Sequence, residues 1–189
     1  ATDVTEAISV VVELKLRGVP AAAHAFNQVL GLVWSRHVPI KDAAVDAFHR
    51  MFLHGRSTAD GVRVLLEMYE QGCKGSGWTY THLASVEELI MQSAEKELIQ
   101  PGKAIAELAG ALKTPACPMA LRTLTALGAA NSADLAAQLG SVAEAVGPGG
   151  SMVGQNAVEQ LERVYLLCKM LQRLSSSARK PLGDAAMGQ

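Results

Sequence analysis

The sequence predicts an all-α fold, an α-solenoid of about nine helices stacked in pairs. Apolar residues recur at spacings of three and four along almost the whole chain of 189 residues, which is the pattern of one helix face. No segment alternates apolar and polar residues over several positions, so no β-strand is expected. Proline and glycine interrupt the pattern at intervals that suit helices of roughly four turns joined mostly by short loops.

In the first half of the chain, the apolar positions define one expected core face for each helix. They are Val4, Ile8, Val11 and Val12; Ala22, Ala25, Phe26, Val29 and Val33; Ile40, Ala44, Ala47, Phe48 and Met51; Val62, Leu65, Leu66 and Tyr69; and Val86, Leu89 and Ile90. Pro20 and Pro39 should each open a helix, because a first turn does not need the N–H that proline lacks. Gly18, Gly55 and Gly72 should each end one.

The segment Leu32–Leu53, LVWSRHVPIKDAAVDAFHRMFL, is expected to turn a corner and then enter a closely packed helix. Ala43, Ala44 and Ala47 supply small positions where neighbouring helices can approach each other. Trp34 is expected to be a large apolar plug near the corner.

The second half of the chain continues the same spacing. Its expected core positions are Ile105, Leu108, Ala109 and Leu112; Leu121 and Leu124; Leu135, Leu139, Val142 and Val146; and Val158, Leu161, Tyr165 and Cys168. Pro101 and Pro115 should open helices, Thr114 and Ser132 should cap them, and Gly147 should end one.

An internal period favours stacked helix pairs over a closed bundle. Pro39 and Pro118 each begin a helical pattern and lie roughly 80 residues apart, close to two periods of about 40, as in HEAT-type repeats. We therefore expect one array over residues 1–175, followed by a flexible polar tail over residues 176–189. The chain starts at Ala1 without a methionine, and we expect it to be a segment of a longer solenoid.

Composition excludes several classes of function. The 17 basic and 18 acidic residues give a net charge of −1, so the chain as a whole is not a polybasic binder of nucleic acid or membranes. No apolar run approaches the length of a membrane span. The three cysteines, Cys73, Cys117 and Cys168, are far apart, and we expect structural thiols in a reducing compartment.

No catalytic, cofactor-binding or metal-binding residues are expected. His49 and His54 are not at the spacing of i and i+4 that places two metal ligands on one helix face. The GCKGSG sequence within Gly72–Trp78 lacks the ending of a phosphate-binding loop and follows a helix, so we interpret it as a flexible inter-repeat loop. An all-α enzyme with a pocket built from His49, His54 and Glu67 remains an alternative, which a deep pocket with strongly shifted pKa values would favour.

Five basic residues are the candidate contacts with a partner or with DNA. They are Lys15, Arg17, Arg36, Lys41 and Arg50. They fall near expected helix ends, which line up along one ridge in a solenoid and can contact phosphate. Acidic residues are equally frequent in this region, which largely cancels the field. A second basic set is expected on a solvated outer face and in the tail; it comprises Arg163, Lys169, Arg173, Arg179 and Lys180.

Two blocks of the sequence resemble the family of condensin complex subunit 1, the HEAT-repeat non-SMC regulatory subunit of condensin. The first joins TDVTEAI at Thr2–Ile8, LVWS at Leu32–Ser35 and IKDAAVDAFHRMFL from Ile40 to Leu53. The second is LASVEELIMQSAEKELIQPGKAIAELAGAL at Leu83–Leu112, and LLCKMLQRLS resembles a later helix of the same array. Asn27-Gln28 stand where the family has a basic pair, which weakens any phosphate contact at that helix.

This resemblance implies a non-catalytic scaffold that binds the kleisin subunit and the SMC ATPase subunits in mitotic chromosome condensation. It implies a location in the nucleus and on chromosomes, with cytoplasm outside mitosis, and leaves ATP hydrolysis to the SMC partners. We expect no cofactor, no membrane and no small-molecule substrate, and we keep weak contact with the DNA backbone as an alternative interaction. The alternative is a HEAT or armadillo-type scaffold that serves as an adaptor or in transport and is unrelated to chromosomes. The composition and the apolar periodicity fit this alternative equally well.

Overall fold

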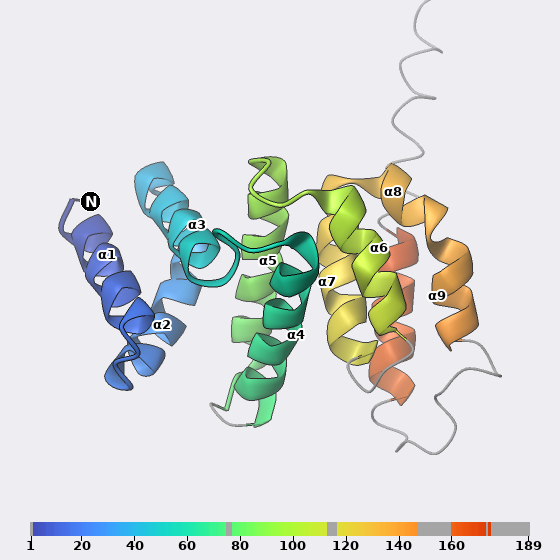
Figure 1. Cartoon of the computed structure of the whole chain (residues 1–189), viewed down its shortest axis with the longest axis horizontal. Helices are drawn as coiled ribbons and strands as arrows, with labels where there is room; N and C mark the ends of the chain where they lie inside the picture. Colours follow the sequence, from blue (N-terminus) through green and yellow to red (C-terminus); the bar gives the residue numbers. More distant parts are fainter. Residues whose placement is uncertain (1, 75–76, 113–116, 147–159, 173, 175–189) are drawn as a thin grey trace, which may run out of the picture. The chain divides into compact units, whose positions relative to one another are not determined.

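A computed structural model describes residues 2–74, 77–112, 117–146, 160–172 and 174, and all regular structure within these ranges is helical (Figure 1). The labelled elements are α1 (Thr2–Leu16), α2 (Ala21–Gly31), the 3-10 turn η1 (Leu32–Trp34), α3 (Val38–Phe52), α4 (Thr58–Lys74), α5 (Tyr80–Glu95), α6 (Pro101–Ala111), α7 (Cys117–Ala130), α8 (Ser132–Ala137) and α9 (Leu139–Val146). Residues 160–172 form a further helix. The predicted all-α class is confirmed. Thr114, Pro115, Gly147, Val158 and the tail over 176–189 lie outside the described residues.

The chain divides into two compact units, Ala1–Ile99 and Gln100–Gln189, called the first and second unit below. None of the helices in the described ranges is both long enough and apolar enough to cross a membrane.

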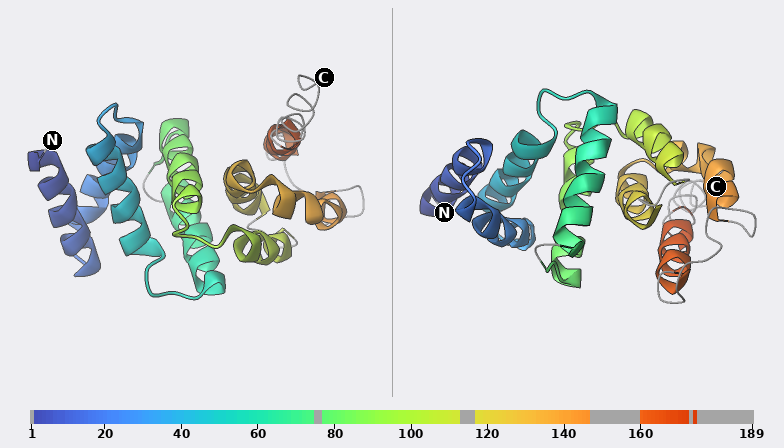
Figure 2. Two further views of the ribbon diagram at one scale, coloured as in Figure 1. Left: turned by 90° about the horizontal axis from the view of Figure 1, so that it is seen from above. Right: turned by 60° about the horizontal axis from the view of Figure 1, so that its bottom comes forward.

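In the first unit, helices pack in successive layers. α1 packs on α2 and α3, α5 packs on α2 and α3, and α4 packs on α3. α1 and α3 run in the same direction and lie against each other, whereas α2 runs the opposite way, as both Figure 1 and Figure 2 show. Equivalent helices of stacked helix pairs are arranged in this way.

Small and aromatic side chains fill the core of the first unit. Ala44 and Ala47 are each 1% exposed, as expected for the small contact positions of α3. Phe52 lies between two buried rings, with centroids 5.2 Å from Phe26 and 5.4 Å from Phe48. Such tilted ring pairs add to the burial of apolar surface that holds these layers together.

The helix boundaries follow most of the predicted signals. Pro20 caps α2, Pro39 lies in the first turn of α3, and Pro101 opens α6. Gly18 and Gly55 have φ of +73° and +71°. Helices often end in this left-handed conformation, which glycine adopts at much lower cost than other residues.

Gly72 does not end a helix, so this prediction was wrong. α4 continues to Lys74, and the ring of Trp78 folds back so closely over Gly72 that a Cβ atom there would collide with it. Gly72 is therefore required for close approach and not for a turn.

Trp34 is also not the expected apolar plug. Its side chain is 54% exposed, and its indole N–H donates a hydrogen bond of 2.9 Å to the hydroxyl of Ser85 on α5. Trp34 thus links the corner to α5 by its polar atom, while much of its ring faces solvent.

In the second unit, α7 packs against α6 and α8, and α8 packs against α6 and α9. Asn131 caps α8, because its side-chain oxygen accepts a hydrogen bond of 3.2 Å from the backbone N–H of Asp134. The predicted cap, Ser132, is the first residue of the helix instead. Asparagine is at least as good a cap as serine, so the choice of register at this end was ambiguous in sequence.

The 160–172 helix has the expected spacing of apolar residues, but the face that it buries is opposite to the predicted core face. Leu166 and Met170 are buried, whereas Leu161, Tyr165 and Cys168, the predicted core positions, are exposed. The helix carries apolar residues on both faces, so periodicity alone did not decide between them. The expectation of a core thiol at Cys168 was wrong for the same reason.

Arg163 is likewise not on a solvated face. It is 3% exposed, and its Nε atom has no hydrogen-bond partner in the described part of the chain.

A buried arginine also connects two helices of the second unit. Arg122 on α7 is 5% exposed and donates a hydrogen bond to the carboxylate of Glu162, which links α7 to the 160–172 helix.

Candidate partner-binding surface of the first unit

The five basic candidates separate into two groups. Lys15 lies in the last turn of α1 and Arg17 directly follows that helix, while Arg50 lies in the last turn of α3, which runs in the same direction. Arg36 precedes α3 and Lys41 is in its first turns, roughly 13 Å along the helix axis from Arg50. The structure therefore brings Lys15, Arg17 and Arg50 to one end of the layer and leaves the other two at the opposite end.

Two of these residues already have intramolecular partners. Arg50 lies 3.0 Å from the carboxylate of Glu13, and Lys41 lies 3.8 Å from that of Glu88. Lys15, Arg17 and Arg36 form no ion pair among the described residues. Exposed pairs of this kind contribute little to stability, but they reduce the positive charge available to a partner.

An open pocket of about 280 Å³ lies at the Lys15 end of the first unit. Its lining residues are Lys15, Ala23, Phe26, Asn27, Phe52, Val64, Glu67, Met68, Gln71, Gly72 and Trp78. We call it the α2–α4 pocket, because most of these residues belong to those two helices. Its apolar part is aromatic and aliphatic, and its polar groups come from three different helices.

Trp78 forms a fixed wall of this pocket. Its indole N–H donates a hydrogen bond of 3.1 Å to the side-chain oxygen of Asn27. Its ring is stacked near that of His82, with centroids 6.4 Å apart, and meets the ring of Tyr69 edge-on at 6.3 Å. The expected flexible loop is thus anchored at Trp78, and Asn27 has the structural role of holding this ring in place.

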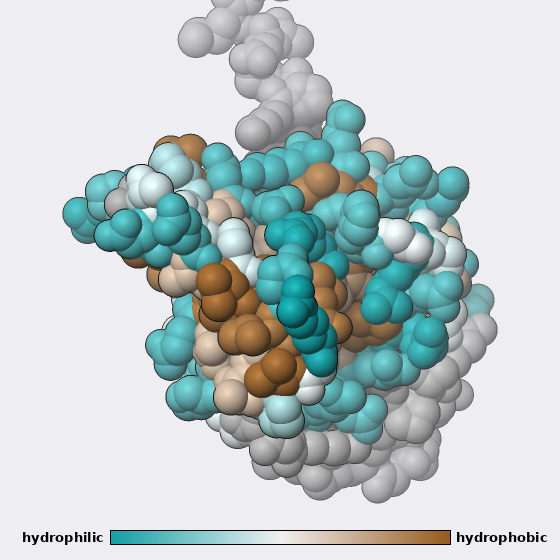
Figure 3. Space-filling model, turned by 60° about the vertical axis from the view of Figure 1, so that its left-hand side comes forward, coloured by the Kyte–Doolittle hydropathy of each residue, from teal (hydrophilic) through white to brown (hydrophobic). Residues whose placement is uncertain are grey.

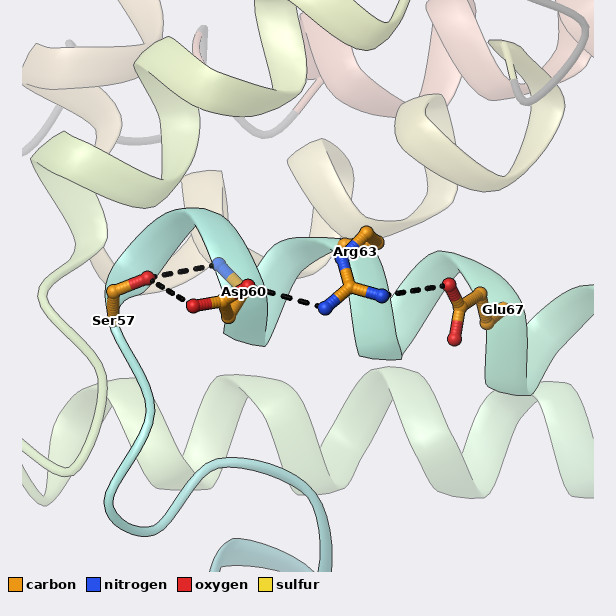
Figure 4. Close-up of polar contacts among 4 residues, drawn as sticks. All are labelled: Ser57, Asp60, Arg63 and Glu67. Atoms are coloured by element: carbon orange, nitrogen blue, oxygen red, sulfur yellow. Dashed lines mark hydrogen bonds and ion pairs between the residues drawn. The ribbon is translucent and has the colours of Figure 1, made fainter.

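A polar row begins at Ser57, runs along α4 and ends at Glu67, which is its one member that lines the pocket (Figure 4). Arg63 donates hydrogen bonds of 3.1 Å to Asp60 and 3.2 Å to Glu67, one from each end of its guanidinium. The hydroxyl of Ser57 donates to Asp60 at 2.7 Å, and this bond, followed by the bond from Arg63, lowers the pKa of Asp60. The same two carboxylates raise the pKa of Arg63. Because Glu67 is held by Arg63, the ammonium of Lys15 is the unopposed charge among the lining residues.

A second feature of the first unit is an exposed apolar stripe on α1. We define the α1 stripe by Ala7, Val10 and Leu14, which follow helical spacing on the side away from the buried Ile8 and Val12. Val10 is 56% exposed. Apolar patches lie on the side of the molecule where α1 is found (Figure 3). Contiguous exposed apolar surface of this kind marks contact sites more often than isolated apolar residues do.

The alternative enzyme site is not assembled in one pocket. His49 and His54 lie together at the end of α3, with ring centroids 5.7 Å apart and edge-on. Glu67 lines the α2–α4 pocket, whose lining includes neither histidine. Burial lowers the pKa of His49, the neighbouring His54 lowers it further, and Asp46 opposes both. In the part of the chain that the structure describes, no group of three acidic, histidine or cysteine residues is arranged to hold a metal ion.

The fold and this surface define an all-α protein built, in its first unit, from stacked helix pairs. Comparison with protein-family models, with curated proteins and with solved structures gave no match.

Proposed function

We propose that this chain is a non-catalytic HEAT-repeat scaffold segment of a condensin regulatory subunit. In this role it binds a segment of the kleisin subunit or a surface of the SMC ATPase subunits during mitotic chromosome condensation. It then acts in the nucleus and on chromosomes, and is cytoplasmic outside mitosis. The layered helix pairs of the first unit and the resemblance over Thr2–Leu53 and Leu83–Leu112 support this proposal.

The α1 stripe is the observation that carries the proposal. Helix-pair arrays present extended surfaces to their partners, and an exposed apolar stripe on a helix is suited to a protein contact. Covering the exposed half of a valine or leucine side chain contributes about 1 kcal/mol. Several such residues in a row therefore provide a useful part of a binding free energy, which a purely solvated face would not.

Binding to overlapping peptides from a condensin kleisin, measured by fluorescence anisotropy, tests the proposal. We expect saturable binding of at least one peptide, and loss of it in a Val10→Glu variant. Val38→Glu is the matched control, because Val38 is an exposed valine at the start of α3 and is not part of the stripe. Arg36→Glu in the same assay tests whether that basic candidate contributes to the contact.

Two results would overturn the proposal. Failure of the unaltered chain to bind any kleisin peptide or SMC head would favour an adaptor or transport scaffold unrelated to chromosomes. Equal losses in Val10→Glu and Val38→Glu would show that the α1 stripe is not the contact.

A further inference from the structure

We propose that the α2–α4 pocket receives one bulky apolar side chain of a protein partner, whose neighbouring carboxylate pairs with Lys15. This inference rests on the proposed function only in taking the partner to be a protein. It does not require that partner to be a condensin subunit, and it uses a different surface from the α1 stripe.

The size of the pocket limits its occupant. Sites for cofactors and drug-sized ligands have volumes of roughly 300–1,000 Å³. The α2–α4 pocket, at about 280 Å³, falls just below that range. Phe26, Phe52, Met68 and Trp78 give it an aromatic and sulfur-containing lining that suits a phenylalanine, leucine or methionine side chain. A single anchoring residue of a peptide therefore fits better than a cofactor.

The charges at the rim determine what should flank that residue. The ammonium of Lys15 has no ion-pair partner among the described residues, while Glu67 is bonded to Arg63 at 3.2 Å. The oxygen of Asn27 accepts from Trp78, which turns its amide N–H₂ group to other acceptors. Donors thus lie on the α1 and α2 side of the pocket, and a carboxylate beside the apolar residue complements them.

The pocket is also built before the partner arrives. The hydrogen bond to Asn27 and the ring contacts with Tyr69 and His82 hold Trp78 in place. A preformed wall reduces the ordering that binding would otherwise require.

The two tryptophans of the chain provide a reporter and an internal control. Nuclear magnetic resonance resolves the indole N–H signal of Trp78, which lines the pocket, from that of Trp34, which is bonded to Ser85 outside it. The probes are the synthetic peptides acetyl-Glu-Phe-Glu-amide, acetyl-Lys-Phe-Lys-amide and acetyl-Glu-Ala-Glu-amide. We expect the first to shift the Trp78 signal saturably, the other two to bind at least about tenfold more weakly, and Trp34 to stay unchanged.

Two matched pairs of variants locate the contact. Lys15→Ala should weaken binding of the first peptide about tenfold, whereas Arg17→Ala, an exposed basic residue at the same end that does not line the pocket, should change it less than twofold. Ala23→Phe should fill the pocket and abolish the Trp78 shift. Ala21→Phe, on the same helix but outside the lining, should leave it intact.

A Trp78 signal that none of the peptides moves would overturn the inference. So would equal losses in Lys15→Ala and Arg17→Ala, which would indicate general attraction between charges. If 3-phenylpropionate alone binds as tightly as the first peptide, the pocket is a small-molecule site and the peptide proposal is wrong. Kleisin binding that is lost in Val10→Glu but unaffected by Ala23→Phe would retain the proposed function while rejecting this pocket as part of it.

Discussion

Gly72 and Gly110 are both helical glycines, yet they have opposite surroundings. A Cβ atom on Gly72 would meet the ring of Trp78, whereas one on Gly110 in α6 would meet no atom within 4 Å. The first glycine allows two parts of the structure to approach each other, and the second only adds freedom to the unfolded chain. The same substitution should therefore have opposite effects at the two positions.

We predict that Gly72→Ala lowers the free energy of unfolding by about 1–3 kcal/mol, because the Trp78 ring must move away from its hydrogen bond with Asn27. Gly110→Ala should raise it by about 0.5 kcal/mol. Urea unfolding of both variants, followed by circular dichroism, measures the difference. Equal effects at the two positions would show that Trp78 does not pack on Gly72 in solution.

The pKa of His49 leads to a prediction on pH. Burial, and then the neighbouring His54, lower this pKa below 6.5, with Asp46 opposing them. Between the lowered folded-state pKa and the unfolded-state value, the unfolded chain binds more protons, so stability rises with pH. The contribution of His49 is therefore fully present above about pH 6.5 and is lost as the pH falls through the folded-state value.

We expect the free energy of unfolding to decrease from pH 7 to pH 5 less steeply in His49→Gln than in the unaltered chain. Urea titrations at several pH values provide the measurement. Identical slopes for the two proteins would show that His49 is as readily protonated in the folded state as in the unfolded state.

Residue-level errors in the sequence predictions have a common physical cause. The burial of Trp34, Cys168 and Arg163 depends on which other element faces them, and periodicity carries no information on that. The predicted helix stop at Gly72 failed because a residue six positions later folds back on it. By contrast, Gly18 and Gly55 were predicted correctly, since a left-handed stop depends only on the local backbone.

At the scale of elements, α8 offers a direct test of capping. We predict that Asn131→Ala lowers the free energy of unfolding by about 1 kcal/mol, because the N–H of Asp134 loses its acceptor. Ser132→Ala, the substitution at the cap expected from sequence, should change it by less than about 0.5 kcal/mol. Thermal unfolding of the two variants distinguishes the caps, and a larger loss in Ser132→Ala would contradict the structure.

The ion pair between α7 and the 160–172 helix gives a second prediction at this scale. Glu162→Ala leaves the buried guanidinium of Arg122 without this carboxylate, and we expect a loss of about 2–3 kcal/mol. Glu107→Ala, an exposed glutamate of α6, is the control and should change stability by less than about 0.5 kcal/mol.

Combining Arg122→Met with Glu162→Ala should recover much of that loss, since the buried guanidinium that this carboxylate balances is then removed as well. Urea unfolding of the single and double variants measures the coupling. Additive effects in the double variant would show that the pair contributes nothing specific.

Which segments form helices, and where those helices begin, was predicted best from the sequence. Pro39, Pro101 and Pro118 all fall in first turns, because that preference is set by proline's own chemistry. The buried face of the 160–172 helix was not predictable, since both of its faces are apolar and only a neighbouring helix decides between them. The α2–α4 pocket was missed for a related reason, because its lining is drawn from four helices and a loop.

For the molecule as a whole, charge separates the protein-binding proposal from DNA binding. The net charge is −1, and the ion pairs of Arg50 with Glu13 and of Lys41 with Glu88 depend on contacts between helices that sequence spacing did not reveal. Of the five basic candidates, only Lys15, Arg17 and Arg36 lack such pairs among the described residues. At most three of these side chains are thus available for phosphate.

We therefore predict weak DNA binding with a shallow dependence on salt. Each phosphate contact contributes about 0.9 to the slope of log K against log salt concentration, so three contacts give a slope no steeper than about −3. Anisotropy of a labelled duplex between about 50 and 200 mM salt measures it. Arg50→Gln should leave the slope unchanged, because Glu13 already holds that guanidinium, whereas Arg17→Gln should reduce it by up to about 1. A slope of about −6 or steeper would require basic contacts beyond these candidates. It would move the role of the chain from protein scaffold to DNA backbone contact.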